Sequence, residues 1–161
     1  MKKKLLFVIN TLGRAGAETA LLELLRQLDS GRYDVFLFVL TGQGELTSAL
    51  PSYVRLLNTD YDNISVLSQA GKRKLMRRAF RSMCVRGTAI RLSPYILRNL
   101  WDMLRCGTVD AKKLLWRVLS DGAPRWNTSY DLAVAYLEGG STYYVADHVK
   151  AAKKAAFVHI D

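Results

Sequence analysis

Residues 2–19 read KKKLLFVINTLGRAGAET, and this stretch decides the fold of the chain. Residues 5–9 form a continuous apolar run of strand length, which is typical of a parallel sheet covered on both faces. Gly13 and Gly16 interrupt the run, and from Glu18 the apolar residues follow the period of a helix, at Ala20, Leu21, Leu24, Leu25 and Leu28. The stretch therefore predicts a strand, a glycine turn and a helix, a unit in which ligands bind beyond the carboxyl end of the strand.

The composition of the chain bounds its class. With 161 residues, half of them hydrophobic, the chain is long enough for one domain with a proper core. Its formal net charge of +10 implies an anionic partner or surface. Cys84 and Cys106 lack partners at metal-ligand spacing and lie in apolar-periodic segments, so we expect structural thiols in a reducing compartment, which indicates a cytoplasmic protein. No window approaches the roughly 20 apolar residues of a membrane-spanning helix.

Further apolar runs follow the first helix along the chain. We predict strands at 33–40, 54–57, 130–137 and 155–160, one helical turn within 45–50, and a helix from Ser141 to about Val149. Strands alternate with helices, which predicts an α/β fold with a five-stranded, mostly parallel sheet and helices on both faces. Because right-handed crossovers place the loops after the strands on one edge, loops 13–18 and 138–141 are expected to lie there together.

A basic helical insert separates the third and fourth predicted strands, at about residues 72–120. Its three amphipathic helices are predicted at 72–86, 94–105 and 110–119. Between Lys72 and Arg117 the insert holds thirteen lysines and arginines against two acids, a local balance of +11, so the rest of the chain is close to neutral.

The first helix of the insert has the form of an interfacial helix. Cations surround a stripe of Leu75, Met76, Ala79, Phe80 and Met83. The cations are Lys72, Arg73, Lys74, Arg77, Arg78, Arg81 and Arg86, of which the first six are expected to contact the membrane. This pattern favours attachment to an anionic membrane surface, and the alternative is a solvated helix face over ordinary core.

Two loops carry the candidate chemistry. Residues 13–18 lack both the dinucleotide fingerprint and the ending of a P-loop, so the glycines indicate either a tight turn or a loop whose backbone N–H groups approach a phosphate or a sugar hydroxyl. Residues 138–141 read Glu-Gly-Gly-Ser, in which Ser141 is a plausible N-cap and the glycines would permit close approach by a ligand. No set of residues is spaced for nucleophilic catalysis or for a metal.

The two histidines differ in their predicted positions. His159 ends a buried-looking strand at the edge where ligands bind, as either a structural or a ligand-contacting residue. His148 lies in a helix beside Asp147 and Lys150 and is predicted to face solvent.

Three stretches together resemble a family 4 glycosyltransferase. The first joins the strand at 4–9 to the loop GRAGAE at 13–18, a helix and YDV at 33–35; the family opens with such a strand and a loop usually written Gly-Gly-Ala-Glu. YDLAVAYLEG at 130–139 resembles a later strand of the family, and KKAAFVHID at 153–161 resembles the following strand, which ends in its histidine. Ala15 stands where the family usually has the first glycine of its pair, and a methyl group there restricts the loop.

The resemblance implies one Rossmann-like domain, residues 1–161, that forms the N-terminal, acceptor-side half of a GT-B fold, with the C-terminal nucleotide-sugar domain absent. The parent enzyme would transfer a sugar, with retention, from a nucleotide sugar to a glycan or lipid-linked acceptor, and cell-surface polysaccharide is the broad family expectation. The nucleotide sugar is a substrate, so no cofactor and no metal are expected, and the fragment alone would be inactive.

The resemblance also implies roles for single residues. Gly13, Ala15, Gly16 and Glu18 would lie against the donor diphosphate or the acceptor. Glu138 and Gly139 would line the floor of the cleft, and His159 would contact the transferred sugar or place the acceptor.

Two other classes of function remain open at this point. A self-contained nucleotide-binding or flavodoxin-like α/β module would bind a nucleotide or flavin tightly. A basic adaptor for nucleic acid would use residues 72–117, but no recognised nucleic-acid module surrounds them, and we expect no nucleic-acid partner.

Overall fold

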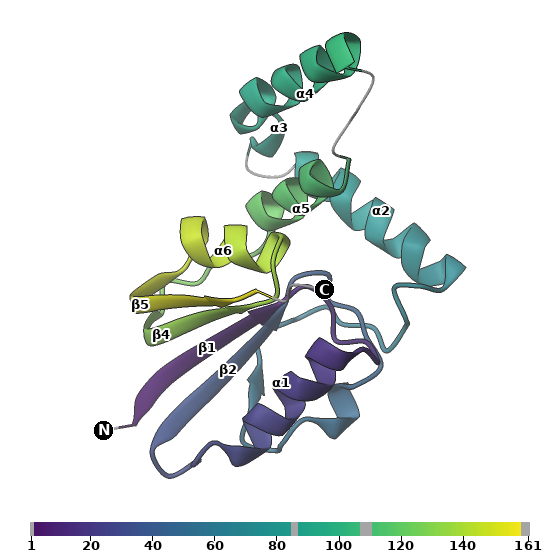
Figure 1. The fold of residues 1–161 in the computed structure, drawn as a ribbon. Helices are drawn as coiled ribbons and strands as arrows, with labels where there is room; N and C mark the ends of the chain where they lie inside the picture. The colour runs from purple at the N-terminus through teal and green to yellow at the C-terminus, as the bar shows by residue number, and fades with distance from the viewer. Residues whose placement is uncertain (1, 85–86, 107–110, 159–161) are drawn as a thin grey trace.

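A computed structural model describes residues 2–84, 87–106 and 111–158 of the chain. Its centre is one five-stranded sheet in which all neighbouring strands are parallel, in the order β3-β2-β1-β4-β5. The strands are β1 (Lys3–Ile9), β2 (Tyr33–Val39), β3 (Arg55–Leu56), β4 (Ser129–Tyr136) and β5 (Lys150–Phe157). The predicted α/β fold with a parallel sheet is therefore confirmed, and its architecture is Rossmann-like (Figure 1).

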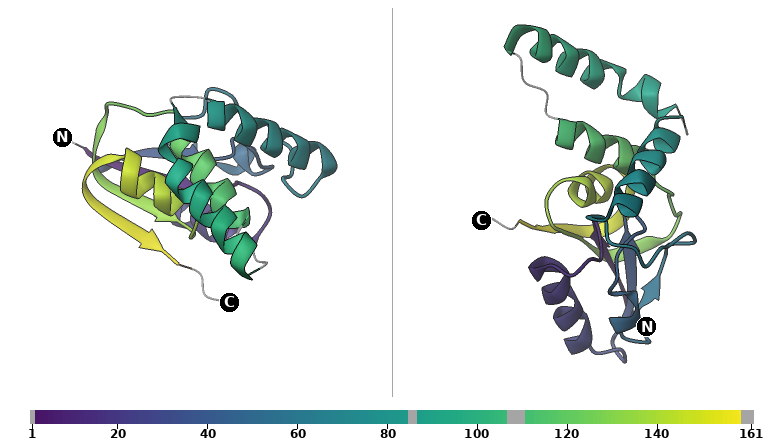
Figure 2. Two further views of the ribbon diagram at one scale, coloured as in Figure 1. Left: turned by 90° about the horizontal axis from the view of Figure 1, so that it is seen from above. Right: turned by 90° about the vertical axis from the view of Figure 1, so that its right-hand side faces the viewer.

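Helices cover both faces of the sheet, as predicted. The helix α1 (Gly16–Gln27) lies on one face, and α6 (Gly140–His148) lies on the other (Figure 1). The insert contributes α2 (Gln69–Cys84), α3 (Thr88–Arg91), α4 (Ser93–Cys106) and α5 (Ala111–Gly122). Of these, α5 packs on α2 and α6, whereas α3 and α4 project away from the sheet (Figures 1 and 2).

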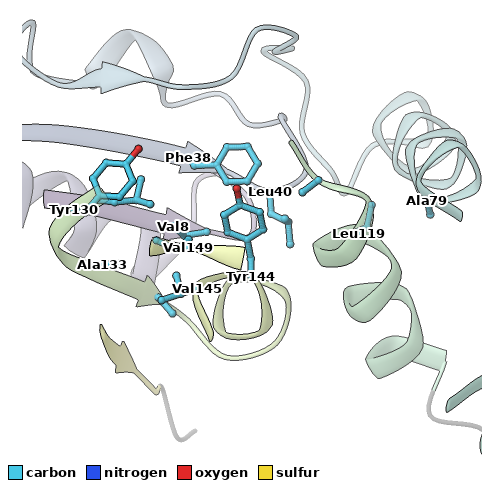
Figure 3. Close-up of a cluster of buried hydrophobic side chains, with 13 residues drawn as sticks. Val8, Phe38, Leu40, Ala79, Leu119, Tyr130, Ala133, Tyr144, Val145 and Val149 are labelled. Atoms are coloured by element: carbon cyan, nitrogen blue, oxygen red, sulfur yellow. The ribbon is translucent and has the colours of Figure 1, made fainter. Parts of the chain in front are cut away.

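The core forms two layers because the side chains of β1 alternate between the faces of the sheet. Leu5, Phe7 and Ile9 pack with Leu21 and Leu25 of α1. On the opposite face, Leu6 and Val8 belong to a cluster that includes Phe38, Leu119, Tyr144 and Val145 (Figure 3). Within this second cluster the rings of Phe38 and Tyr144 are 4.9 Å apart, so α6 is anchored to the sheet by aromatic packing.

Several predicted boundaries are wrong. The fifth strand begins at Lys150 rather than at Ala155, and α5 continues to Gly122. The short α3 was not predicted, and the helical turn within 45–50 is a single turn of 3₁₀ helix, η1 (Thr47–Ala49). The strand β5 is also far more exposed than a covered parallel strand, since the side chain of Phe157 is 50% exposed.

The apolar faces of the insert are only partly buried. In α2, Ala79 is buried and Leu75 packs against the core, but Met76 and Phe80 are exposed, so the predicted stripe divides between two sides of the helix. In α4 a row at helical spacing faces solvent, and it consists of Leu97, Leu100, Trp101 and Leu104. The exposed fraction of Trp101 is 60%, although its neighbours in the row are all apolar.

Candidate functional site

Asn10 joins the end of β1 to loop 138–141 at the carboxyl edge of the sheet. It follows β1 directly, and its Nδ2 donates a hydrogen bond of 2.8 Å to the backbone oxygen of Glu138. The backbone N–H of Ser141 donates to Asn10 Oδ1, also at 2.8 Å. The prediction that loops 13–18 and 138–141 share one edge is therefore confirmed, and Asn10 is the residue that fixes loop 138–141 to the end of the central strand.

Loop 13–18 leads into α1, and the N-terminus of this helix has no side-chain cap. Ala15 is the N-cap and is extended, and no side-chain hydrogen bond caps the helix. The first N–H groups of a helix have no partner within the helix, so those at the start of α1 point beyond the end of β1. This arrangement can accept an anion or a hydroxyl oxygen.

The packing of the fold does not require glycine at either of the two glycine positions of this loop. A Cβ at Gly16 would have no atom within 4 Å, and a Cβ at Gly13 would have only the Glu45 carboxylate at 3.7 Å, an ordinary contact. Neither glycine has a positive φ. A tight turn that sterically requires glycine therefore does not explain these two residues.

Glu18 is buried and is turned toward the loop rather than outward. The hydroxyl of Thr11 donates to its Oε1 at 2.8 Å, which closes the loop across seven residues. The carboxylate also lies in the first turn of α1, where the helix dipole favours negative charge. Glu18 thus supports the loop from inside, and the exposed backbone at Ala15 and Gly16 faces solvent.

A third loop, residues 41–46, carries no recognisable sequence motif and stabilises loop 13–18 from its other side. Leu12 donates its N–H to the backbone oxygen of Gln43 at 3.0 Å, and the N–H of Leu46 donates to the oxygen of Leu12 at 3.1 Å. Gly44 has a φ of +144°, and a Cβ there would lie 2.1 Å from the oxygen of Leu12. Here the close approach of two backbones does require glycine.

Loop 138–141 has a structural reason for its second glycine. A Cβ at Gly140 would lie 2.3 Å from Leu40 and 2.9 Å from Trp116, so packing excludes any larger residue. Gly139 has a φ of +92° and is the N-cap of α6. The predicted N-cap role of Ser141 is wrong, because its hydroxyl donates to the backbone oxygen of Leu137 at 2.5 Å instead.

Leu137 itself is strained. Its φ of +96° is in a region that a branched side chain rarely adopts. Ser141 and Thr142 both donate their hydroxyls to its backbone oxygen, at 2.5 and 3.2 Å. Strain that surrounding hydrogen bonds maintain is typical of functional loops, and it directs Glu138, which is exposed, away from the core.

The two histidines have different outcomes. His159 lies outside the described residues. His148 was predicted to face solvent, and this prediction is wrong: its side chain is 9% exposed and its Nε2 lies 3.4 Å from Asp121 Oδ1. Burial lowers the pKa of His148, and Arg125 lowers it further, while Asp121 opposes both. The reason is that α6 packs on α5, which brings Asp121 against it.

The predicted membrane-facing helix has six cations among the described residues, and Arg86 lies outside them. The environments of these six differ. Lys74 forms an ion pair with Asp62, and Arg78 donates to the backbone oxygen of Thr41. Burial lowers the pKa of Arg78, which Asp60 opposes. Among the described residues, no ion pair involves Lys72, Arg73, Arg77 or Arg81. Lys74 and Arg78 therefore bind to loop residues, and the other four cations are available to a ligand or a surface.

Within the described part of the chain, no helix has both the length and the apolar character that crossing a membrane requires.

Comparison with known proteins leaves the family open, because no family model, no curated protein and no solved structure matches the chain. The features that bear on function are therefore the loops at the carboxyl edge of the sheet and the three stretches of sequence that resemble a family 4 glycosyltransferase.

Proposed function

We propose that the chain is the N-terminal, acceptor-side domain of a retaining glycosyltransferase that transfers a sugar from a nucleotide-sugar donor to a glycan or a lipid-linked acceptor. The observation that carries the proposal is loop 13–18. This loop follows the central strand and leads into α1, whose N-terminus has no side-chain cap. The packing of the fold does not require glycine at either of its two glycine positions. Open backbone N–H groups at this place suit an anionic or hydroxylated ligand.

The chemistry follows from where charge develops. When the bond between sugar and diphosphate breaks, negative charge grows on the leaving oxygens, and N–H groups that are fixed in advance stabilise it. Asn10, Thr11 and Leu12 provide this rigidity, because each is bonded to a different neighbour. In this proposal loop 13–18 contributes N–H groups, and a second α/β domain holds the nucleotide. The exposed strand β5 offers a surface on which further elements of such an enzyme would pack.

The test uses an enzyme in which a second α/β domain is joined to this one. Transfer from labelled nucleotide sugars should be measured, and the anomeric configuration of the product determined. Gly16→Val should lower kcat roughly 10²-fold by displacing the ligand from the loop, with unchanged thermal unfolding. Ala20→Val, at an exposed position one turn further along α1, is the matched control and should leave kcat unchanged.

The isolated chain offers a second, independent measurement. It should transfer no sugar and should bind nucleotide sugar weakly in calorimetry. Micromolar affinity for a nucleotide or a flavin would contradict the proposal and would favour the self-contained binding module.

The same proposal includes attachment to an anionic membrane, with α4 rather than α2 as the inserting helix. Its apolar row faces solvent, and Arg98 and Arg105 are exposed on the same helix. The guanidinium of Arg105 lies 5.8 Å from the ring centroid of Trp101, so cation and apolar group lie together, as at a membrane interface. At roughly 1 kcal/mol per basic residue near an anionic surface, a few engaged cations would recruit the protein.

Vesicle co-sedimentation tests this attachment. Binding to anionic vesicles should exceed binding to neutral ones and should fall for Trp101→Ser combined with Leu104→Ser. The control is Leu67→Ser, which removes an even more exposed apolar group from the loop before α2. Equal losses for the two variants, or equal binding to both kinds of vesicle, would contradict a specific role for α4.

A further inference from the structure

One face of α2 forms the wall of an open groove. The groove has a volume of about 800 Å³, and its other side is formed by Asp60, which follows β3, and by Gly122 at the end of α5. Five cations of α2 line it: Arg73, Lys74, Arg77, Arg78 and Arg81. Its size lies in the range of small-molecule sites, and no residue of loop 13–18 lines it.

The positive charge of the groove exceeds what the protein neutralises. Asp62 pairs with Lys74, and the carboxylate of Asp60 lies 3.9 Å from Arg78. These two carboxylates leave three arginines of the groove, Arg73, Arg77 and Arg81, with no ion pair in the described part of the chain. Like charges around one concavity repel each other, so the groove favours an anion that brings them together.

Arg78 forms the rigid base of the groove. It bonds to the backbone oxygen of Thr41, and its Nη2 lies 3.5 Å from the backbone oxygen of Asp60. Gly42 has a φ of +61° and makes room for this guanidinium, since a Cβ there would collide with it. The guanidinium of Arg78 is thus fixed by two loops, and the three arginines of α2 that have no ion pair within the described residues surround it.

The three unpaired arginines recur every four residues. They therefore lie along one side of α2, over a length of about 12 Å at a rise of about 1.5 Å per residue. A guanidinium presents a planar fork that matches two oxygens of a phosphate, and a row of three forks exceeds the need of one phosphate group. The spacing thus matches an anion with at least two linked phosphates.

We propose that the α2 groove is a binding site for a diphosphate group, held by Arg73, Arg77 and Arg81 over the guanidinium of Arg78. The diphosphate belongs either to a small soluble molecule or to the head of a lipid. The site is separate from loop 13–18, and it stands whether or not the chain takes part in glycosyl transfer.

Calorimetry with inorganic pyrophosphate at low salt is the first test. The groove variant combines Arg73→Gln, Arg77→Gln and Arg81→Gln. It should bind pyrophosphate about tenfold more weakly or worse, because each charge-assisted hydrogen bond contributes more than a neutral one. The control variant combines Arg98→Gln, Lys112→Gln and Lys113→Gln, which removes the same charge from α4 and α5, and it should bind like the native chain. Equal weakening in both variants, or no binding by the native chain, would overturn the proposal.

Hydrogen exchange on the native chain provides a test without substitutions. Pyrophosphate should slow the exchange of amides in residues 69–84 and leave α4 unchanged. Slowing elsewhere, or none, would overturn the proposal even if the groove variant failed to fold. A further arm distinguishes the source of the diphosphate: vesicles that carry a lipid diphosphate should displace pyrophosphate if the ligand is a lipid, whereas displacement only by soluble diphosphate esters assigns a soluble ligand.

Discussion

Replacing Asn10 by alanine should release loop 138–141 from the central strand. The amide side chain is 7% exposed and makes two hydrogen bonds of 2.8 Å, one given to Glu138 and one accepted from Ser141. The backbone oxygen of Asn10 also accepts from the N–H and the hydroxyl of Thr41, at 3.0 and 2.9 Å, and this connection to β2 stays. The substitution therefore removes only the two hydrogen bonds to loop 138–141, which links β4 to α6.

The expected magnitude follows from these two bonds. Each neutral hydrogen bond contributes about 1 kcal/mol, and a buried donor or acceptor left without a partner costs about 1–3 kcal/mol. Water can reach the exposed side of Glu138 but not the buried N–H of Ser141, so we expect a loss of about 2–4 kcal/mol in the free energy of unfolding. For a chain of this length, that corresponds to a fall in Tm of roughly 5–15 °C.

Urea and thermal unfolding, followed by circular dichroism, measure this loss. Asn127→Ala removes the same amide from an exposed position and should change stability by less than about 0.5 kcal/mol. Asn10→Asp is a sharper variant, because the carboxylate still accepts from Ser141 but meets the backbone oxygen of Glu138 without a proton to give. The reasoning fails if Asn10→Ala unfolds like the Asn127→Ala control, since Asn10 would then connect nothing.

The other predictions concern two glycines and a histidine. Gly16→Ala should leave stability unchanged or raise it by up to about 1 kcal/mol, because the added methyl meets open space, and urea unfolding that shows a clear loss would contradict this. Gly44→Ala is its matched opposite and should cost at least about 2 kcal/mol in the same assay, because the methyl meets backbone at a positive φ; equal midpoints for the two variants would refute the contrast. Because burial lowers the pKa of His148, the unfolded state takes up its proton first as the pH falls below about 6.5, so stability should decrease there by up to about 1.4 kcal/mol per pH unit. His148→Gln should flatten this decrease between pH 5 and pH 7, and an unchanged slope would assign the effect to other groups.

The sheet was predictable because the residues of its inner strands form continuous apolar runs. The run that became β1 has no polar face, and the structure buries it from Leu5 to Ile9. The strand β5 was misplaced by five residues for the opposite reason. Its first half reads KAAKK, which favours a helix by propensity, and only parallel pairing with β4 makes it a strand.

Periodicity predicted the helices of the insert but not their environments. A stripe at a spacing of three and four residues shows that a helix has an apolar face, not which element covers it. In α5, which packs on α2 and α6, Val118 and Leu119 of the stripe are buried, whereas in α4 the same pattern faces solvent. His148 was misread for a related reason, since Asp121 lies 27 positions away in the sequence and reaches it only through the packing of α5 on α6.

Within the candidate site, the sequence indicated the loops but not Asn10, which fixes loop 138–141 to the end of β1. Asn10 and Glu138 are separated by 128 positions, so no local pattern could show their hydrogen bond. One signal was present: an amide directly after an all-apolar strand lies at the edge where parallel strands end, and a buried amide needs partners there.

The distribution of charge separates two surfaces of the molecule. The loops at the carboxyl edge carry exposed Arg14, buried Glu18 and exposed Glu138, and they offer backbone N–H groups beside a single arginine. The α2 groove instead offers guanidinium groups, which attract an anion over a longer distance and depend on salt. Fixed N–H groups suit a charge that develops during a reaction, and flexible arginines suit a charge that is already present before binding. The groove is therefore suited to retain a charged ligand, while the loops are suited to the reacting group.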